Sequence, residues 1–103
     1  MRKIEWTLSA VSDAKNIRDF IARDSKSYAD RFLHRIIQAI ENTAAYPMLG
    51  RSVPETPDEN IREILFQEYR IMYRVETSRI LVLMVIHGSR DLGQLAPKPW
   101  EVL

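Results

Sequence analysis

The sequence contains no cysteine and few groups that could hold a metal or a cofactor. The absence of cysteine excludes disulfide bonds and thiol chemistry, and it fits a reducing compartment. The two histidines, His34 and His87, lie on different predicted elements, so a metal site is not expected. The three glycines form no glycine-rich phosphate loop. The sequence therefore predicts neither a metal nor a cofactor.

Long hydrophobic runs are also absent. The longest run, Ile80 to Ile86, is far shorter than the roughly 18 residues that a membrane span requires. The amino terminus becomes charged within its first few residues and lacks the apolar core of a signal peptide. We therefore expect a cytoplasmic protein with no membrane partner.

What the chain does contain is the composition of one soluble domain. Its 103 residues are 46% apolar and 28% charged, a mixture typical of globular proteins. A chain of this length has room for one domain and buries enough surface to fold without crosslinks. We divide it into a domain at residues 1–92 and a tail at residues 93–103. Trp100 in the tail could dock on the domain or on a second subunit, or the tail could lack structure.

The first sixty residues predict one strand, two helices and a loop. Alternation over Lys3 to Thr7 indicates a short strand. Apolar residues at helical spacing predict a first helix that ends near Asp24, and a second, antiparallel helix that Pro47 and Gly50 terminate. The candidate caps are Ser9 or Ser12 for the first helix and Ser25 or Ser27 for the second. Leu49 to Asn60 has no periodicity and is predicted to be a loop.

Three strands are predicted over residues 61–66, 69–75 and 80–87. The short connections between them require antiparallel hairpins. The run from Ile80 to Ile86 is apolar on both faces, which is typical of a central, covered strand. The sequence thus predicts an α+β fold, in which an N-terminal strand, a helical hairpin and a three-stranded antiparallel meander form one sheet with the helices on one face.

The middle strand predicts a division between the two faces of the sheet. Ile71, Tyr73 and Val75 share one face, which should pack under the helices. Arg70 and Arg74 share the other, where we expect their guanidinium groups to lie on an open surface.

Arginine is unevenly distributed beneath a net charge of only +1. Eleven of the fifteen basic residues are arginine, and no lysine occurs between Tyr46 and Arg90. That stretch contains Arg51, Arg62, Arg70, Arg74, Arg79 and Arg90. Because the planar guanidinium suits phosphate and carboxylate groups, the set favours an anionic partner, either a nucleic acid or an acidic protein segment. Individually, these arginines could equally be solvated strand and turn residues.

The order of elements and a series of short motifs resemble one known family. The motifs are Trp6 with Ala10, Pro47 with Gly50-Arg51, Val53-Pro54-Glu55, Ile61-Arg62-Glu63, Tyr69-Arg70-Ile71-Met72-Tyr73-Arg74-Val75 and His87-Gly88-Ser89-Arg90. In this order, over residues 4 to about 92, they resemble the RelE/ParE superfamily of toxins from type II toxin–antitoxin systems, also known as the plasmid stabilisation protein family. The resemblance implies a cognate antitoxin, a small DNA-binding protein whose disordered C-terminal segment folds on the toxin in a hetero-oligomer.

The resemblance implies two alternative mechanisms, because ParE-like members inhibit DNA gyrase whereas RelE-like members cleave messenger RNA in the ribosome. For the RelE-like alternative it implies Glu55 as a carboxylate base and Arg70 as the stabiliser of a phosphorane, and His87 is the candidate acid or base. The candidate residues for binding a target or an antitoxin are Arg51, Arg62, Arg70, Arg74 and Arg90.

Three departures from the ribonuclease pattern favour the gyrase alternative. YoeB-type ribonucleases end with a His-Tyr pair where this chain has Ser89-Arg90. The chain also lacks the lysines that RelE carries before the sheet, and its charge is nearly neutral where ribonuclease members are strongly basic. A third alternative is an inactive module that retains only antitoxin binding.

Each candidate site residue also has a structural interpretation. Glu55 could be a solvated loop acid, and His87 could bond the backbone and lock the turn after the last strand. Arg62 could pair with Glu63 or Glu68 across the hairpin.

Overall fold

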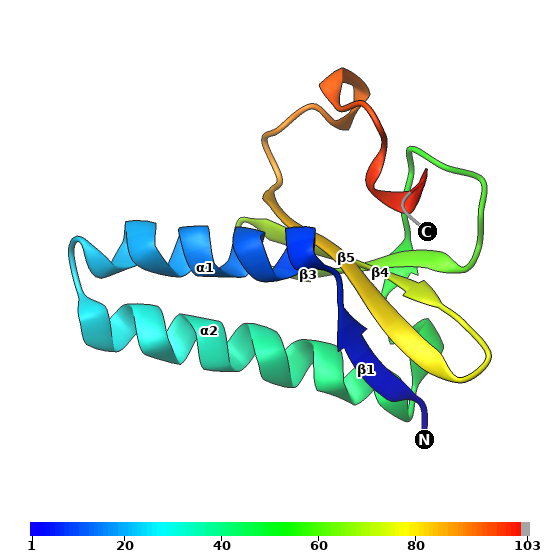
Figure 1. The fold of residues 1–103 in the computed structure, drawn as a ribbon, viewed down its shortest axis with the longest axis horizontal. Helices are drawn as coiled ribbons and strands as arrows, with labels where there is room; N and C mark the ends of the chain where they lie inside the picture. Colours follow the sequence, from blue (N-terminus) through cyan, green and yellow to red (C-terminus); the bar gives the residue numbers. More distant parts are fainter. Residues whose placement is uncertain (102–103) are drawn as a thin grey trace.

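A five-stranded mixed sheet organises the chain, with the strand order β1-β5-β4-β3-β2 (Figure 1). The computed structural model describes residues 1–101. The strands are β1 (Lys3–Trp6), β2 (Arg51–Ser52), β3 (Ile61–Phe66), β4 (Tyr69–Val75) and β5 (Arg79–His87). β1 pairs in parallel with β5, and the other pairs are antiparallel. The predicted α+β fold is confirmed, with β2 as an additional short strand inside the predicted loop.

The predicted helical hairpin is also present, but its first helix begins earlier than the sequence pattern indicates. The helices are α1 (Leu8–Ala22) and α2 (Lys26–Glu41), and Figure 1 shows them side by side. Thr7, rather than Ser9 or Ser12, caps α1, because its hydroxyl accepts a hydrogen bond from the Ala10 N–H at 3.1 Å. Of the two candidate caps for α2, Ser25 and Ser27, the structure shows Ser25 as the cap. Within residues 1–101, neither helix is long and apolar enough to cross a bilayer.

The main core lies between the helix pair and one face of the sheet. Phe32 and Ile36 from α2 pack against Ile71, Tyr73 and Val82 from the two central strands, and all five are at most 2% exposed. The predicted inward face of the middle strand is therefore confirmed. This packing fixes which side chains of β4 point away from the helices, and Arg70 and Arg74 are among them.

The opposite face of the sheet is covered, contrary to the expectation of an open surface. A second apolar cluster on it contains Val53, Ile61, Met72, Leu81, Leu83, Ile86 and Leu92, with Met84, Leu95 and Trp100 packed against it. A register shift between Met72 and Tyr73 inserts an extra residue in β5, so that both Leu83 and Met84 lie on this side. An apolar strand needs cover on both faces, and the chain after β5 supplies it (Figure 1, orange to red).

The segment after β5 is held in place by its own polar contacts. It contains two short 3₁₀ helices, η3 (Leu92–Gln94) and η4 (Pro99–Glu101). The Lys98 ammonium donates to the carbonyls of Leu92, Gly93 and Leu95 at 2.8 to 3.1 Å. Of the alternatives left open for Trp100, the structure shows docking on the domain.

Candidate functional site

The carboxylate of Glu63 lies fully buried at the centre of an ionic cluster on the face opposite the helices. It accepts a hydrogen bond from Arg70 Nε at 2.6 Å and one from Arg51 Nε at 2.7 Å. The register explains both contacts. β2 places Arg51 directly opposite Glu63, and the β3–β4 hairpin pairs Leu65 with Arg70, which sets Glu63 diagonally across from Arg70.

Glu55 completes the cluster from the loop that follows β2. Its two carboxylate oxygens accept from Arg70 Nη1 at 2.9 Å and Nη2 at 2.8 Å, a bidentate pair. This hydrogen bonding to Arg70 lowers the pKa of Glu55 below 4.5 and raises the pKa of Arg70. We refer to Arg51, Glu55, Glu63 and Arg70 as the Glu63 cluster.

A cleft of about 500 Å³ opens beside the Glu63 cluster. Its lining includes Arg51, Glu55, Tyr69, Arg70 and His87. The structure therefore brings together the three candidate catalytic residues, Glu55, Arg70 and His87, although they are far apart in the sequence.

His87 forms hydrogen bonds with both of its ring nitrogens. Nδ1 accepts from the Ser89 N–H at 3.1 Å and lies 2.7 Å from the Ser89 hydroxyl. In the neutral imidazole this leaves the proton on Nε2, which lies 3.2 Å from the Glu68 carboxylate. The Tyr69 ring meets His87 edge-on, with 5.4 Å between the ring centroids. His87 thus bonds the backbone of the turn after β5, as its structural interpretation predicts.

The other candidate arginines lie outside the cleft. Arg62 donates to the carbonyls of Gly50 at 2.9 Å and Glu59 at 3.1 Å. Neither of the two ion pairs considered for Arg62, with Glu63 or with Glu68, forms among residues 1–101. Arg62 and Glu63 are adjacent on β3, so their side chains point to opposite faces of the sheet. Arg90 borders a different hollow, next to α1.

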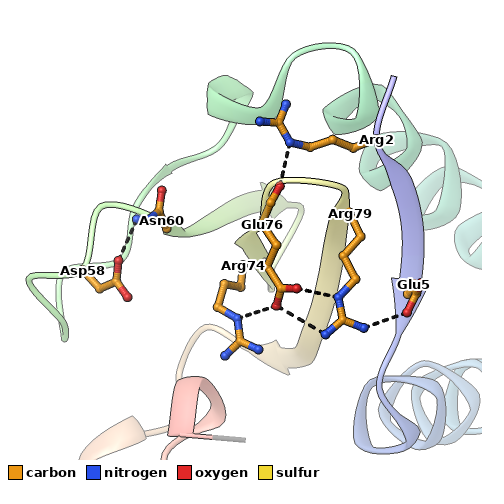
Figure 2. A network of polar contacts seen from close by, with 7 residues as sticks. All are labelled: Arg2, Glu5, Asp58, Asn60, Arg74, Glu76 and Arg79. Carbon is orange, nitrogen blue, oxygen red and sulfur yellow. Dashed lines mark hydrogen bonds and ion pairs between the residues drawn. The ribbon is translucent and has the colours of Figure 1, made fainter. Parts of the chain in front are cut away.

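Arg74 belongs to a second ionic network, at the turn between β4 and β5. Figure 2 shows the Glu76 carboxylate between two guanidinium groups, with Arg74 Nε at 2.8 Å and Arg79 Nε at 2.6 Å. Arg79 also donates to Glu5 of β1 at 2.7 Å, and Arg2 donates to the Glu76 carbonyl at 2.8 Å. The hydrogen bond from Arg79 lowers the pKa of Glu76, and the hydrogen bond from Arg74 lowers it further by a smaller amount. The network joins the edge strand β1 to the β4–β5 turn.

Comparison with known proteins identifies the family. Residues 4–92 match the family profile described as the ParE toxin of a type II toxin–antitoxin system, parDE. The chain belongs to this family. It is a toxin of a type II toxin–antitoxin system, and the predicted membership of the RelE/ParE superfamily is confirmed.

Individual relatives of this ParE-family toxin agree with the assignment. It is 31% identical over 91 residues to toxin RelE2 of Caulobacter vibrioides, covering 87% of this chain and 99% of that protein. The chromosomal ParDE system of P. aeruginosa contains a chain of the same fold, with a TM-score of 0.70 and 18% identity over 84% of this chain and 96% of the other. The RelBE2 toxin–antitoxin complex of Mycobacterium tuberculosis gives a TM-score of 0.61 at 16% identity, with the same coverage of both chains.

The charges of the cluster in this ParE-family toxin balance one another, because two guanidinium groups face two carboxylates. All three nitrogens of the Arg70 guanidinium donate to carboxylate oxygens. Among residues 1–101, no buried side-chain nitrogen or oxygen lacks a hydrogen-bond partner. Arg51 differs, because its side chain is 54% exposed and Glu63 binds it through Nε. Recognition of an external anion is therefore easier for Arg51 than for Arg70.

Glu63 is the member of the cluster that sequence reasoning missed as a site residue. Glu63 lies two residues after the buried Ile61, where the alternation of a strand would place another core residue. Its exposed fraction is 1%. The two-residue connection between β3 and β4 fixes the register of the hairpin, and this register places Glu63 diagonally across from Arg70. The contact between Glu63 and Arg70 could therefore have been predicted from the sequence.

Proposed function

We propose that this toxin inhibits growth by ParE-like action on DNA gyrase, and that a cognate antitoxin neutralises it. The observation that carries the proposal is the closed arrangement of the Glu63 cluster. Arg70 and Glu55 already bind each other, with two contacts of 2.8 and 2.9 Å. Neither group is poised for chemistry on an external substrate.

Cleavage of RNA needs a base for the 2′-hydroxyl, positive charge for the phosphorane and an acid for the leaving oxygen. The lowered pKa of Glu55 weakens it as a base. The carboxylates of Glu55 and Glu63 neutralise Arg70, which reduces its attraction for a phosphate. Inhibition through protein contacts requires none of these three functions.

The decisive experiment measures both activities with the same purified chain. If gyrase is the target, the chain inhibits supercoiling of relaxed plasmid by purified gyrase, and its induction in cells causes DNA breaks and an SOS response. Primer extension on messenger RNA from the same cells then shows no new 5′ ends. Codon-specific cuts within minutes of induction, with gyrase unaffected, would contradict the proposal.

A second candidate, ribosome-dependent cleavage of messenger RNA, is favoured by a different observation. Glu55, Arg70 and His87 converge on one cleft, as a ribonuclease site would require. Under this alternative His87→Gln reduces the rate of cleavage by about 100-fold or more, since it removes a general acid or base. The absence of cuts with the unaltered chain would remove this candidate directly.

The proposed antitoxin is a small DNA-binding protein with a disordered C-terminal segment that folds on the toxin. Support comes from membership of the ParE family and from solved relatives described as toxin–antitoxin complexes. Co-expression with the product of a neighbouring short reading frame should restore growth, and the two chains should elute together. A chain that leaves growth unchanged without any antitoxin would instead be an inactive binding module.

A further inference from the structure

The turn after β5 places a serine hydroxyl against an imidazole. His87 to Arg90 form a β-turn, in which the Arg90 N–H donates to the His87 carbonyl at 3.0 Å. Ser89 is the third residue of this turn, and its hydroxyl oxygen lies 2.7 Å from His87 Nδ1. Ser89 is exposed, so a molecule in solution can reach the hydroxyl. The pair has the separation of a nucleophile and its general base.

The backbone of the turn fixes the state of the imidazole. The Ser89 N–H donates to His87 Nδ1 at 3.1 Å, and only an unprotonated ring nitrogen can accept this bond. The Ser89 hydroxyl is therefore the donor in its own contact with Nδ1. The proton of the neutral ring lies on Nε2, on the side of Glu68. His87 thus presents a lone pair to the hydroxyl, as a general base must.

Glu68 orients the imidazole from its other side. The Glu68 carboxylate lies 3.2 Å from His87 Nε2, and the Gly88 N–H donates to the Glu68 carbonyl at 2.7 Å. A Cβ at position 88 would lie 3.2 Å from that carbonyl, so glycine permits the close approach. The Tyr69 ring restrains the imidazole edge-on. Carboxylate, imidazole and hydroxyl therefore follow one another in the order of a catalytic triad.

Glu68, His87 and Ser89 all line the cleft of about 500 Å³ beside the Glu63 cluster. Arg51 lines the same cleft. Because it binds Glu63 through Nε alone, its two Nη atoms have no hydrogen-bond partner among residues 1–101. Leu65, which is 51% exposed, contributes an apolar surface to the cleft. An ester matches both features, since its acyl chain is apolar and its carbonyl oxygen becomes negative during attack.

We propose that Ser89 is a nucleophile that hydrolyses short-chain carboxylic esters in this cleft, with His87 as its general base and Glu68 as a positioning residue. His87 Nδ1 takes the hydroxyl proton as Ser89 Oγ bonds to the carbonyl carbon. Nδ1 then gives the proton to the leaving alcohol as the ester C–O bond breaks. Water cleaves the acyl-serine by the same route, which releases the acid and restores the hydroxyl. The positive charge of Arg51 stabilises the oxyanion in both steps.

The nucleophile is tested by treating the full-length chain with an alkyl fluorophosphonate, from which an activated serine oxygen displaces fluoride. Peptide mass spectrometry locates the adduct. Ser89 should react at least about 100-fold faster than Ser12, an exposed serine of α1 that has no hydrogen bond to a histidine within residues 1–101. Ser89→Ala should abolish the adduct, and the matched control Ser12→Ala should leave it unchanged. Hydrolysis of p-nitrophenyl butyrate should show the same pattern.

The base and the positioning residue are tested by substitution. His87→Gln should lower the labelling rate by about 100-fold, whereas His34→Gln on α2 should have no effect. Glu68→Gln should lower the rate by about three- to fivefold, because the Glu68 side chain is 79% exposed and solvent screens its charge. This loss should fall on the rate constant of the covalent step and leave the affinity for the probe unchanged. Unchanged far-UV circular dichroism verifies that the variants fold.

Several results would overturn the proposal. One is labelling of Ser89 no faster than that of Ser12, and another is an unchanged rate in His87→Gln. Ester hydrolysis that persists in Ser89→Ala would assign the reaction to the imidazole alone. The proposed function is tested separately, because the labelling measurements do not involve gyrase. Ser89→Ala should still inhibit supercoiling as strongly as the parent chain, so the two proposals can fail independently.

Discussion

Replacement of Glu63 by glutamine should destabilise the protein far more than the same replacement of Glu76. The two residues form a matched pair, because each carboxylate accepts from the Nε atoms of two arginines. The distances are 2.6 and 2.7 Å for Glu63, and 2.6 and 2.8 Å for Glu76. They differ in burial, since the Glu63 side chain is fully buried and that of Glu76 is 27% exposed.

The difference in burial sets the expected magnitudes. Glu63→Gln leaves Arg70, whose side chain is 10% exposed, with only Glu55 as a charged partner, and it points an amide N–H at one of the two donors. Loss of one partner of a buried ion pair costs about 3 kcal/mol or more. Glu76→Gln removes two partly exposed ion pairs, with Arg74 and Arg79, which together contribute about 1 kcal/mol or less.

Urea unfolding provides the measurement. At about 1.5 kcal/mol per molar urea, a loss of about 3 kcal/mol lowers the midpoint by about 2 M. Glu76→Gln should lower it by less than about 0.7 M and become indistinguishable from the parent at high salt. Equal shifts for the two variants, with unchanged slopes, would show that burial does not govern these contacts and would refute the reasoning.

Three further predictions concern the surroundings of the cluster and the C-terminal segment. Gly50→Ala should lower stability by about 2 kcal/mol in thermal unfolding, because an added Cβ would lie 2.7 Å from the buried Tyr73 hydroxyl. Glu55→Gln should destabilise the protein above pH 4.5, and its difference from the parent should shrink at lower pH. The reason is that Arg70 lowers the folded pKa of Glu55, so its contribution is lost as pH falls through that value. Lys98→Met should accelerate limited proteolysis within residues 92–101 by about tenfold, and an unchanged rate would show that its three carbonyl contacts do not hold the segment.

The regular elements could be predicted because their signals are local. Alternation and short connections define β3 and β4 with the bounds that the structure shows, and the apolar stripe of α2 identifies its buried face. The cap of α1 was missed because Thr7 reads equally well as the last residue of the preceding strand. A cap depends on the direction in which the chain leaves β1, and periodicity does not contain that information.

The cover on the second sheet face could not be predicted in the same way. Val53 and Trp100 contribute to it from segments without periodicity, and both contacts join residues distant in the sequence. The sequence of β5 did indicate this cover, because the strand is apolar on both sides. A sheet left uncovered on the face opposite the helices would expose Leu81 and Leu83 to water. The double-sided pattern of one strand was therefore a better guide to that face than the arginines of its neighbour.

The ion pairs change what the arginine content of the chain means. Between Tyr46 and Arg90, arginines are abundant, but Arg51, Arg70, Arg74 and Arg79 all bind carboxylates of the same chain. A guanidinium that is already paired attracts an external anion weakly, so the number of arginines in a stretch overstates its affinity for a nucleic acid or an acidic protein. On α2, Arg31 and Arg35 have no carboxylate partner among residues 1–101. An anionic partner is thus more readily accommodated along α2 than at the arginine-rich strands that first suggested one.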